Sequence, residues 1–189
     1  MADEETGTEW SHLLGKAMRG PLQGTELEPL PSTMTTWEAW KREHPKTTVL
    51  NLSQTADRYI KQFYSRPNRF VFGWVHGREH VYFVEFPQML QQDLMNITTT
   101  DAQFLLTFDR DSTAANLFLP ELDGDVLTFG RTEPGRMEDL ETFSVWNSQT
   151  GVALSGPLEG RRLEQLVGIM SFARAWKIFH PDSIQVKPR

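Results

Sequence analysis

Two aspartates in the stretch FDRDS are the residues most able to do chemistry. Asp109 and Asp111 lie on either side of Arg110. On an extended strand they would share one face, where two carboxylates can hold a hard cation or divide the roles of acid and base. The more ordinary interpretation is a solvated loop in which an arginine pairs with an aspartate. Asp109, Arg110 and Asp111 are therefore candidate ligand-binding residues.

Histidines come next, because imidazole binds metals and transfers protons near neutral pH. His76 and His80 are four residues apart in HGREH, around a glycine and between β-rich flanks. The residue order of a zinc-protease motif is missing, so this stretch predicts a hairpin turn and no metal site. His80 remains a candidate ligand-binding residue. His44 and His180 each precede a proline at the end of a predicted helix, where we expect them to act as caps.

An exposed aromatic ring is the remaining candidate. The sequence contains six tryptophans, and most should be buried. If one of them is exposed, Trp37 is the candidate, and an exposed indole can stack on a sugar or a base. No Ser–His–Asp arrangement or nucleotide-binding motif is present. With no cysteine, thiol chemistry is excluded, and we assign no catalytic residue, metal or cofactor.

Composition and charge exclude further classes of protein. The chain has 189 residues, of which 39% are hydrophobic and 11% aromatic, enough to bury a core in one domain. The formal net charge of −6 argues against nucleic-acid binding, which needs clustered Lys and Arg. No apolar run of about 18 residues is present, so we expect no membrane span. A protein partner or a homo-oligomer stays open.

The N-terminus, MADEETGTEW, lacks the basic and apolar regions of a signal peptide. The chain as written is therefore expected in the cytoplasm unless a leader was removed.

The two ends of the chain align with each other without a gap when one is shifted by 136 residues. Roughly 19 of about 48 aligned positions are identical, which indicates an internal repeat. The alignment predicts copies at 3–50 and 139–186, each a strand–turn–strand followed by a short helix. The clearest match is GPLQG at 20–24 with GPLEG at 156–160. Proline removes a backbone donor there and no helix follows, so both stretches are turns and not phosphate-binding loops.

The middle of the chain, 69–133, is rich in β-branched and aromatic runs. We expect it to supply a mainly antiparallel sheet, and FGRTEPGRMED to be a loop. In the two copies, Thr35 and Ser171 are the expected helix caps. The prediction is a single α+β domain, 1–189, with short helices and the repeat at its two ends.

Four stretches resemble segments of the domain-of-unknown-function family numbered 3179. The stretch DEETGTEWSHLLGKAMRGPLQG resembles the family segments D-x-E-T-x-S-x-W-x-Q and G-x-A-x-x-G-x-x-x-G-x-x-L. The stretch TTWEAWKREHPKT resembles its segment T-x-W-x-x-W-x-x-x-H-P-x-T. Two later stretches, VFGWVHGREHVYFVEFPQML and MSFARAWKIFHPDS, resemble its V-x-G-V-x-x-x-G-x-A-x-A-Y-P-x-x-x-L and F-x-x-A-W-x-x-F-H-P-x-T segments. The resemblance covers nearly the whole chain and implies a fold, but no activity.

The chain departs from that family at two points. Members often carry C-P-L-C after a strand that reads like V-x-V-T-Y, and here FLLTF is followed by DRDS, Asp109–Ser112. A metal or redox role of that motif is therefore unsupported in this chain. Members are also usually longer, which implies that this chain begins with the tail of one half, followed by a whole second half.

Taken together, these patterns favour a non-catalytic binding or structural module. The alternative is a metal-dependent or acid/base enzyme that uses Asp109, Asp111 and a histidine.

Overall fold

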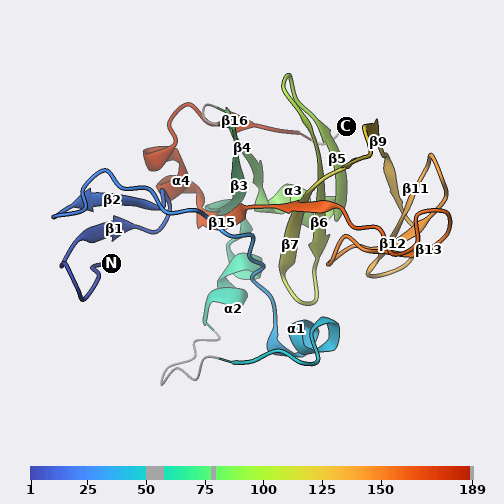
Figure 1. Cartoon of the computed structure of the whole chain (residues 1–189), viewed down its shortest axis with the longest axis horizontal. Helices are drawn as coiled ribbons and strands as arrows, with labels where there is room; N and C mark the ends of the chain where they lie inside the picture. Colours follow the sequence, from blue (N-terminus) through green and yellow to red (C-terminus); the bar gives the residue numbers. More distant parts are fainter. Residues whose placement is uncertain (50–57, 78–79, 188–189) are drawn as a thin grey trace.

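Two four-stranded sheets form the centre of the molecule in the computed structural model, which describes residues 1–49, 58–77 and 80–187 (Figure 1). The first sheet contains, in order, β15 (Gly168–Phe172), β3 (Phe70–His76), β4 (His80–Glu85) and β16 (Ile184–Gln185). The second contains β14 (Glu164–Leu166), β7 (Ala114–Leu119), β6 (Gln103–Asp109) and β5 (Leu94–Thr98). Their strand pairs are antiparallel, apart from the parallel pair β16–β4.

The main core lies between these two sheets. Side chains alternate across a strand, and Trp74 and Tyr82 of the first sheet meet Phe104 and Leu106 of the second in one buried cluster. The predicted hairpin at HGREH is confirmed, since His76 is paired with His80. Arg78 and Glu79 of that stretch lie outside the described residues.

A third sheet covers the outer face of the second. It contains, in order, β10 (Phe129–Arg131), β11 (Arg136–Asp139), β12 (Val145–Asn147) and β13 (Ala153–Ser155). Met137 and Trp146 of this sheet pack against Leu105 and Phe118 of the second sheet. The expected loop over FGRTEPGRMED is therefore wrong. It contains β10 and β11, because its Pro-Gly pair makes a tight turn in which Gly135 adopts a φ of +76°.

Two short ribbons complete the strands. They are β1 (Glu9–Ser11) with β2 (Lys16–Arg19), and β8 (Glu121–Leu122) with β9 (Asp125–Val126).

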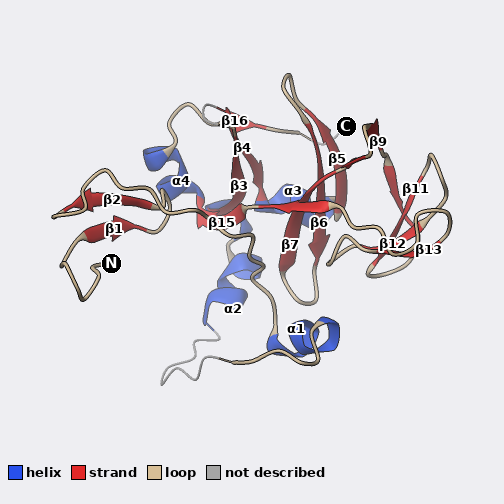
Figure 2. Cartoon of the chain, in the orientation of Figure 1, coloured by secondary structure: helices blue, strands red, loops and turns tan. Residues whose placement is uncertain are grey.

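The helices are short and lie outside the sheets (Figure 2). They are α1 (Trp37–Glu43), α2 (Arg58–Ser65), a 3-10 turn (Pro67–Arg69), α3 (Phe86–Gln91) and α4 (Ala173–Phe179). The α+β class with a mainly antiparallel arrangement is thus confirmed. None of the described helices is long and apolar enough to span a membrane.

Helix α4 covers the outer face of the first sheet, where Trp176 packs against Val71 and Phe83. Ser171 does not cap it as expected. Ser171 belongs to β15, and Phe172 takes the cap position without a side-chain bond. At the other end, the His180 backbone N–H donates to the Trp176 carbonyl at 2.8 Å. Burial lowers the pKa of His180, so its ring favours the neutral form and contributes little charge to the helix end.

The ribbon β1–β2 is organised around the carboxylate of Asp3. Asp3 accepts hydrogen bonds from the Thr6 backbone N–H at 2.6 Å and from the Trp10 indole N–H at 2.9 Å. Leu13, in the loop between the two strands, packs against the cluster around Trp176. The ribbon is therefore attached beside α4 at one end of the molecule (Figure 1).

Acid should loosen this ribbon at an unusually low pH. The Trp10 indole, with the Thr6 groups, lowers the pKa of Asp3 from 3.8 to about 2. A carboxyl with a depressed pKa stabilises the fold above its ordinary pKa, and this contribution is lost as the pH falls through the folded value. We expect the NMR resonance of the Trp10 indole N–H to titrate with a midpoint near 2, and to lose that transition in Asp3→Asn. A midpoint at the ordinary value of 3.8 would contradict the assignment.

Candidate functional site

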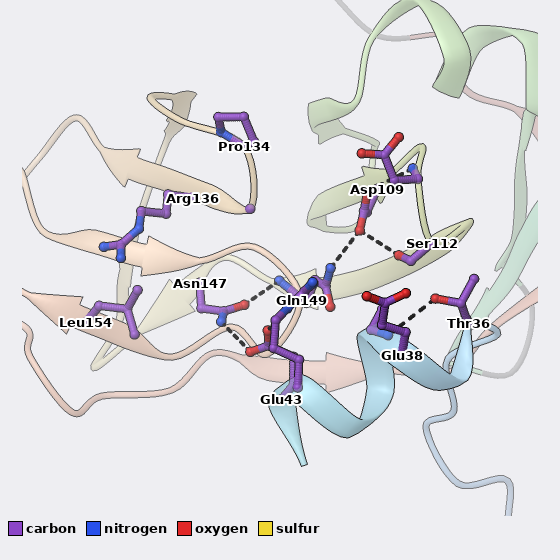
Figure 3. Close-up of a pocket in the computed structure, with 14 residues that line it drawn as sticks. Thr36, Glu38, Glu43, Asp109, Ser112, Pro134, Arg136, Asn147, Gln149 and Leu154 are labelled. Carbon is purple, nitrogen blue, oxygen red and sulfur yellow. Dashed lines mark hydrogen bonds and ion pairs between the residues drawn. The ribbon is translucent and has the colours of Figure 1, made fainter. Parts of the chain in front are cut away.

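A cavity of about 540 Å³ lies between α1, the turn from β6 to β7 and the third sheet. Figure 3 shows its lining, in which Glu38 and Glu43 project from α1 toward side chains of the other two elements. The polar groups that line it are Thr36, Glu38, Arg42, Glu43, Asp109, Asp111, Ser112, Arg136, Asn147 and Gln149. Most of its wall can therefore form hydrogen bonds.

Helix α1 starts one residue later than expected. Thr36, and not Thr35, occupies the cap position, and its hydroxyl accepts a hydrogen bond from the Ala39 backbone N–H at 3.3 Å. The helix ends at His44, as the following proline predicts. Ala39 is its buried residue, so few apolar contacts hold α1 in place. A polar contact contributes instead, since Asn147 Nδ2 donates to Glu43 Oε2 at 2.9 Å.

Asp109 is the most constrained carboxylate in the lining. It is the last residue of β6 and is paired with Ala114 across a tight turn. Its Oδ1 accepts from the Asp111 backbone N–H at 3.0 Å. Its Oδ2 accepts from Ser112 Oγ at 2.6 Å and from Gln149 Nε2 at 2.8 Å. The carboxylate is thus fixed from two elements that are distant in the sequence.

The loop after β12 positions Gln149. Asn147 Oδ1 accepts from the backbone N–H groups of Gln149 at 2.8 Å and of Thr150 at 3.0 Å. This side-chain turn is typical of asparagine. Asn147 therefore holds Glu43 through its amide nitrogen and the Gln149 backbone through its amide oxygen.

Negative charge predominates in the cavity. Four carboxylates and two guanidinium groups belong to the lining. Arg42 pairs with Glu43 at 3.2 Å, and Arg136 lies 3.8 Å from Glu133. Both arginines are thus partly neutralised by glutamates close to them in the sequence. The exposed carboxylates of Glu38 and Asp111 also face the cavity.

A second cavity of about 420 Å³ adjoins the first and shares Glu43, Asn147, Gln149 and Leu154 with it. Its wall includes Asn116, which is only 2% exposed. Asn116 Oδ1 accepts from Thr33 Oγ1 at 2.6 Å. The two cavities together form one cleft beneath α1.

The residues proposed from the sequence do not all meet in this cleft. Asp109 and Asp111 line it. Arg110 belongs to the same turn, but its guanidinium donates to the Leu90 carbonyl and its own carbonyl accepts from the Tyr64 hydroxyl. Trp37 is 52% exposed, as predicted, and does not line the cleft.

His80 lies at the opposite end of the sandwich. Its Nδ1 is 3.9 Å from Oδ2 of Asp101, and the other oxygen of Asp101, Oδ1, accepts from the Tyr82 hydroxyl. Burial of Asp101 opposes its ionisation, but hydrogen bonds from Tyr82 and Thr99 and the charge of His80 lower its pKa overall. Strand β6 begins two residues after Asp101, ends at Asp109 and is about 20 Å long.

No group of three or more His, Asp or Glu side chains that could hold a metal ion is found among residues 1–49, 58–77 and 80–187. Among the described residues no histidine lines the first cavity, whereas His44 lines the adjoining second cavity.

Several lining residues were missed by the sequence interpretation. The stretch NSQTG after Trp146 contains the asparagine turn signal that could have identified Asn147 and Gln149. No signal in the sequence of α1 predicts that Glu43 lines a site, because its partner Asn147 is 104 residues away in the sequence.

Comparison with known families supports the resemblance seen in the sequence. The sequence model of the family described as "Protein of unknown function (DUF3179)" matches residues 1–183. The chain belongs to this DUF3179 family. Neither the curated proteins nor the solved structures that were searched gave a significant match. Family membership therefore assigns this chain no activity.

Proposed function

We propose that this DUF3179 protein is a non-catalytic binding module that holds a small polar ligand in the cleft beneath α1. The observation that carries the proposal is the fixed Asp109 carboxylate, oriented by Ser112 and Gln149 at the wall of the first cavity. Cavities of roughly 300–1,000 Å³ are typical of small-molecule sites. Asp109 and Asp111 are the ligand contacts that we retain from the sequence prediction.

The surroundings of Asp109 favour a binding role over a catalytic one. Its oxygens accept three hydrogen bonds, which leaves about one of four lone-pair positions, on Oδ1, for a donor from a ligand. Ser112 and Gln149 hold the carboxylate in place, and no histidine among the described residues lines the first cavity to exchange a proton with it. Asp109 is therefore suited to act as a fixed acceptor. The alternative enzyme, with Asp109, Asp111 and a histidine acting together, gains no support from this arrangement.

The ligand should be rich in hydrogen-bond donors. Carboxylates outnumber guanidinium groups in the lining, and the exposed oxygens of Glu38 and Asp111 are acceptors. Arg110 has a positioning role, because its contacts to Leu90 and Tyr64 hold the turn that carries the two aspartates. Trp37 and His80 remain candidates for contacts outside this cleft.

Ligand titrations followed by NMR test this proposal. The probes are glucose, glycine, putrescine and succinate, which represent neutral, zwitterionic, cationic and anionic ligands. We expect a donor-bearing probe to shift the side-chain amide resonances of Asn147 and Gln149. In Asp109→Asn the binding should weaken at least ~10-fold, equal to about 1.4 kcal/mol. The matched control is Asp125→Asn, which alters an exposed aspartate of β9 outside the cleft.

Two results would contradict the proposal. One is that no probe moves these amide resonances, and the other is that succinate binds best. If the Asp109→Asn variant bound the probe with wild-type affinity, Asp109 would not be a ligand contact.

We propose further that the chain is a single domain in which 3–50 and 139–186 are two copies of one strand–turn–strand–helix unit around 69–133. Position 50 lies outside the described residues. Matching hydrogen bonds support this proposal: Asp139 accepts from the Thr142 backbone N–H at 2.5 Å and from the Trp146 indole at 2.8 Å, as Asp3 does from Thr6 and Trp10.

The glycine-rich turns and helix ends match in the same way. Thr8 Oγ1 accepts from the Leu22 backbone N–H at 3.3 Å, and Ser144 Oγ accepts from that of Leu158 at 3.0 Å. The rings of Trp40 and His44 lie 4.0 Å apart, and those of Trp176 and His180 lie 4.4 Å apart. Removing either aspartate should therefore loosen its own hairpin through loss of the same contacts.

A further inference from the structure

The second cavity contains a buried amide group whose N–H donors are not used by the described part of the chain. Asn116, in β7, is 2% exposed and belongs to the lining of this cavity. Its Oδ1 accepts from Thr33 Oγ1 at 2.6 Å and from Gln165 Nε2 at 3.3 Å, but no described residue accepts from its Nδ2. A buried N–H group without a partner costs free energy. The Asn116 amide is therefore suited to donate to a ligand.

Two further donors line the same cavity. The Thr35 hydroxyl oxygen is buried and has no hydrogen-bond partner among the described residues. Arg162 is exposed and forms no ion pair within the described part of the chain. Glu43 is the one acidic residue of the described lining, and it is engaged by Arg42 and Asn147. A carboxylate on a ligand would provide acceptors for several of these donors at once.

The first cavity has the opposite character. Its lining includes the exposed carboxylates of Glu38 and Asp111 and the fixed carboxylate of Asp109, on which Oδ1 retains a position for a donor. An ammonium group on a ligand carries the complementary charge and donates hydrogen bonds to such oxygens. The cleft thus combines acceptors for an ammonium group in one cavity with donors for a carboxylate in the other.

The two sets of groups lie on one face of the second sheet. Asp109 of β6 is paired with Ala114 of β7, and Asn116 is two residues further along β7. Side chains two residues apart on a strand share a face, and such diagonal neighbours are about 7–8 Å apart. Gln149 lines both cavities and donates to Asp109 at 2.8 Å, so the cavities adjoin at its side chain. A ligand with a short carbon chain between two charged ends can therefore contact both.

We propose that the cleft binds a small amino acid whose ammonium group lies at Asp109 and whose carboxylate lies at Asn116 and Arg162, the two charged groups being separated by a short carbon chain. This proposal rests on the binding function proposed for the cleft beneath α1 and specifies its ligand class. A ligand with only one charged group makes the polar contacts of one cavity and leaves the groups of the other without a partner.

Three probes with the same number of carbon atoms test this assignment by NMR titration. 4-Aminobutyrate carries both charged groups, whereas butylamine lacks the carboxylate and butyrate lacks the ammonium group. We expect 4-aminobutyrate to bind at least ~10-fold more tightly than either of the other two, because each charge-assisted hydrogen bond adds to its affinity. The side-chain amide resonances of Asn116 should shift with 4-aminobutyrate and stay in place with butylamine.

Two substitutions test the carboxylate end. Asn116→Asp keeps the oxygen that Thr33 contacts but replaces the donor by an acceptor, and it should weaken binding of 4-aminobutyrate at least ~10-fold. Arg162→Gln alters an exposed residue and should weaken it at least ~3-fold, as for an exposed ion pair. Neither change should weaken binding of butylamine. The matched control is Arg161→Gln, which removes a neighbouring guanidinium that pairs with Asp123 at 2.8 Å and lines neither cavity.

Thermal unfolding establishes that each variant is folded. Butylamine that binds as tightly as 4-aminobutyrate and shifts only the amides of Asn147 and Gln149 would overturn this proposal and leave a binding site in the first cavity. Equal binding of butyrate would overturn it too, as would binding of 4-aminobutyrate that neither Asn116→Asp nor Arg162→Gln weakens. If no probe shifts any amide of the cleft, the binding function itself is contradicted.

Discussion

Asp139→Ala should destabilise the protein by about 3–5 kcal/mol, because it removes a buried acceptor on which several donors depend. Asp139 is fully buried. Its carboxylate accepts from the Thr142 and Ser144 backbone N–H groups, the Thr142 hydroxyl and the Trp146 indole. Without Asp139 these donors have neither the carboxylate nor free access to water. Chemical unfolding followed by tryptophan fluorescence measures the change in the free energy of unfolding.

The matched control is Asp3→Ala in the N-terminal hairpin. Asp3 makes the corresponding contacts with Thr6 and Trp10, but it is partly exposed, so water can replace the lost acceptor. We expect a much smaller loss of global stability, together with local loosening that is visible in the Trp10 resonance. Equal losses of unfolding free energy in the two variants would show that burial of the aspartate does not determine how far its removal destabilises the protein.

The β3–β4 hairpin and the two glycine-rich turns were predictable because their signals are local, whereas strands β10 and β11 in FGRTEPGRMED were not expected. HGREH predicted the β3–β4 hairpin, and GPLQG and GPLEG predicted turns in which Gly20 and Gly156 adopt positive φ. The helix caps were placed less well. Thr35 and Thr36 are adjacent hydroxyl residues, and only the backbone geometry selects Thr36.

The cleft was not predictable in the same way. Its first cavity exists because α1, the β6–β7 turn and the loop after β12 meet, and no periodicity within one segment indicates such a meeting. Asp109 was chosen for its residue type and sequence context. Its partner Gln149 is 40 residues away and was not considered. Residue type thus identified one side of the site, and tertiary structure supplied the other.

The stretch DRDS lies in the candidate site and supplies Asp109, Asp111 and Ser112 to its lining. These side chains present oxygen acceptors at the cavity wall, and the chain contains no cysteine. Oxygen acceptors favour hydrogen-bonded binding of a polar ligand over soft-metal or thiol chemistry.

Gly73→Ala is expected to have a comparable effect on the first sheet. Gly73 lies in β3 beneath Trp176, and an added Cβ would come within 2.3 Å of indole carbon Cζ2. Trp176 is 1% exposed, so its indole is enclosed by the rest of the protein. We expect a loss of about 3 kcal/mol, the upper end of the range typical of overpacked cores. Gly130→Ala is the control, because its nearest neighbour, Leu140 Cδ2, is 3.9 Å away.

A double-mutant cycle separates this clash from a general intolerance of side chains in β3. Trp176→Phe alone should also destabilise the protein, because it leaves a void above Gly73. In Gly73→Ala/Trp176→Phe the methyl group occupies part of that void. The double variant should therefore be more stable than the sum of the single changes predicts, by about 1–3 kcal/mol. Additive losses would mean that Gly73 is required for a reason other than contact with Trp176, and the attachment of α4 to the sheet would then need another explanation.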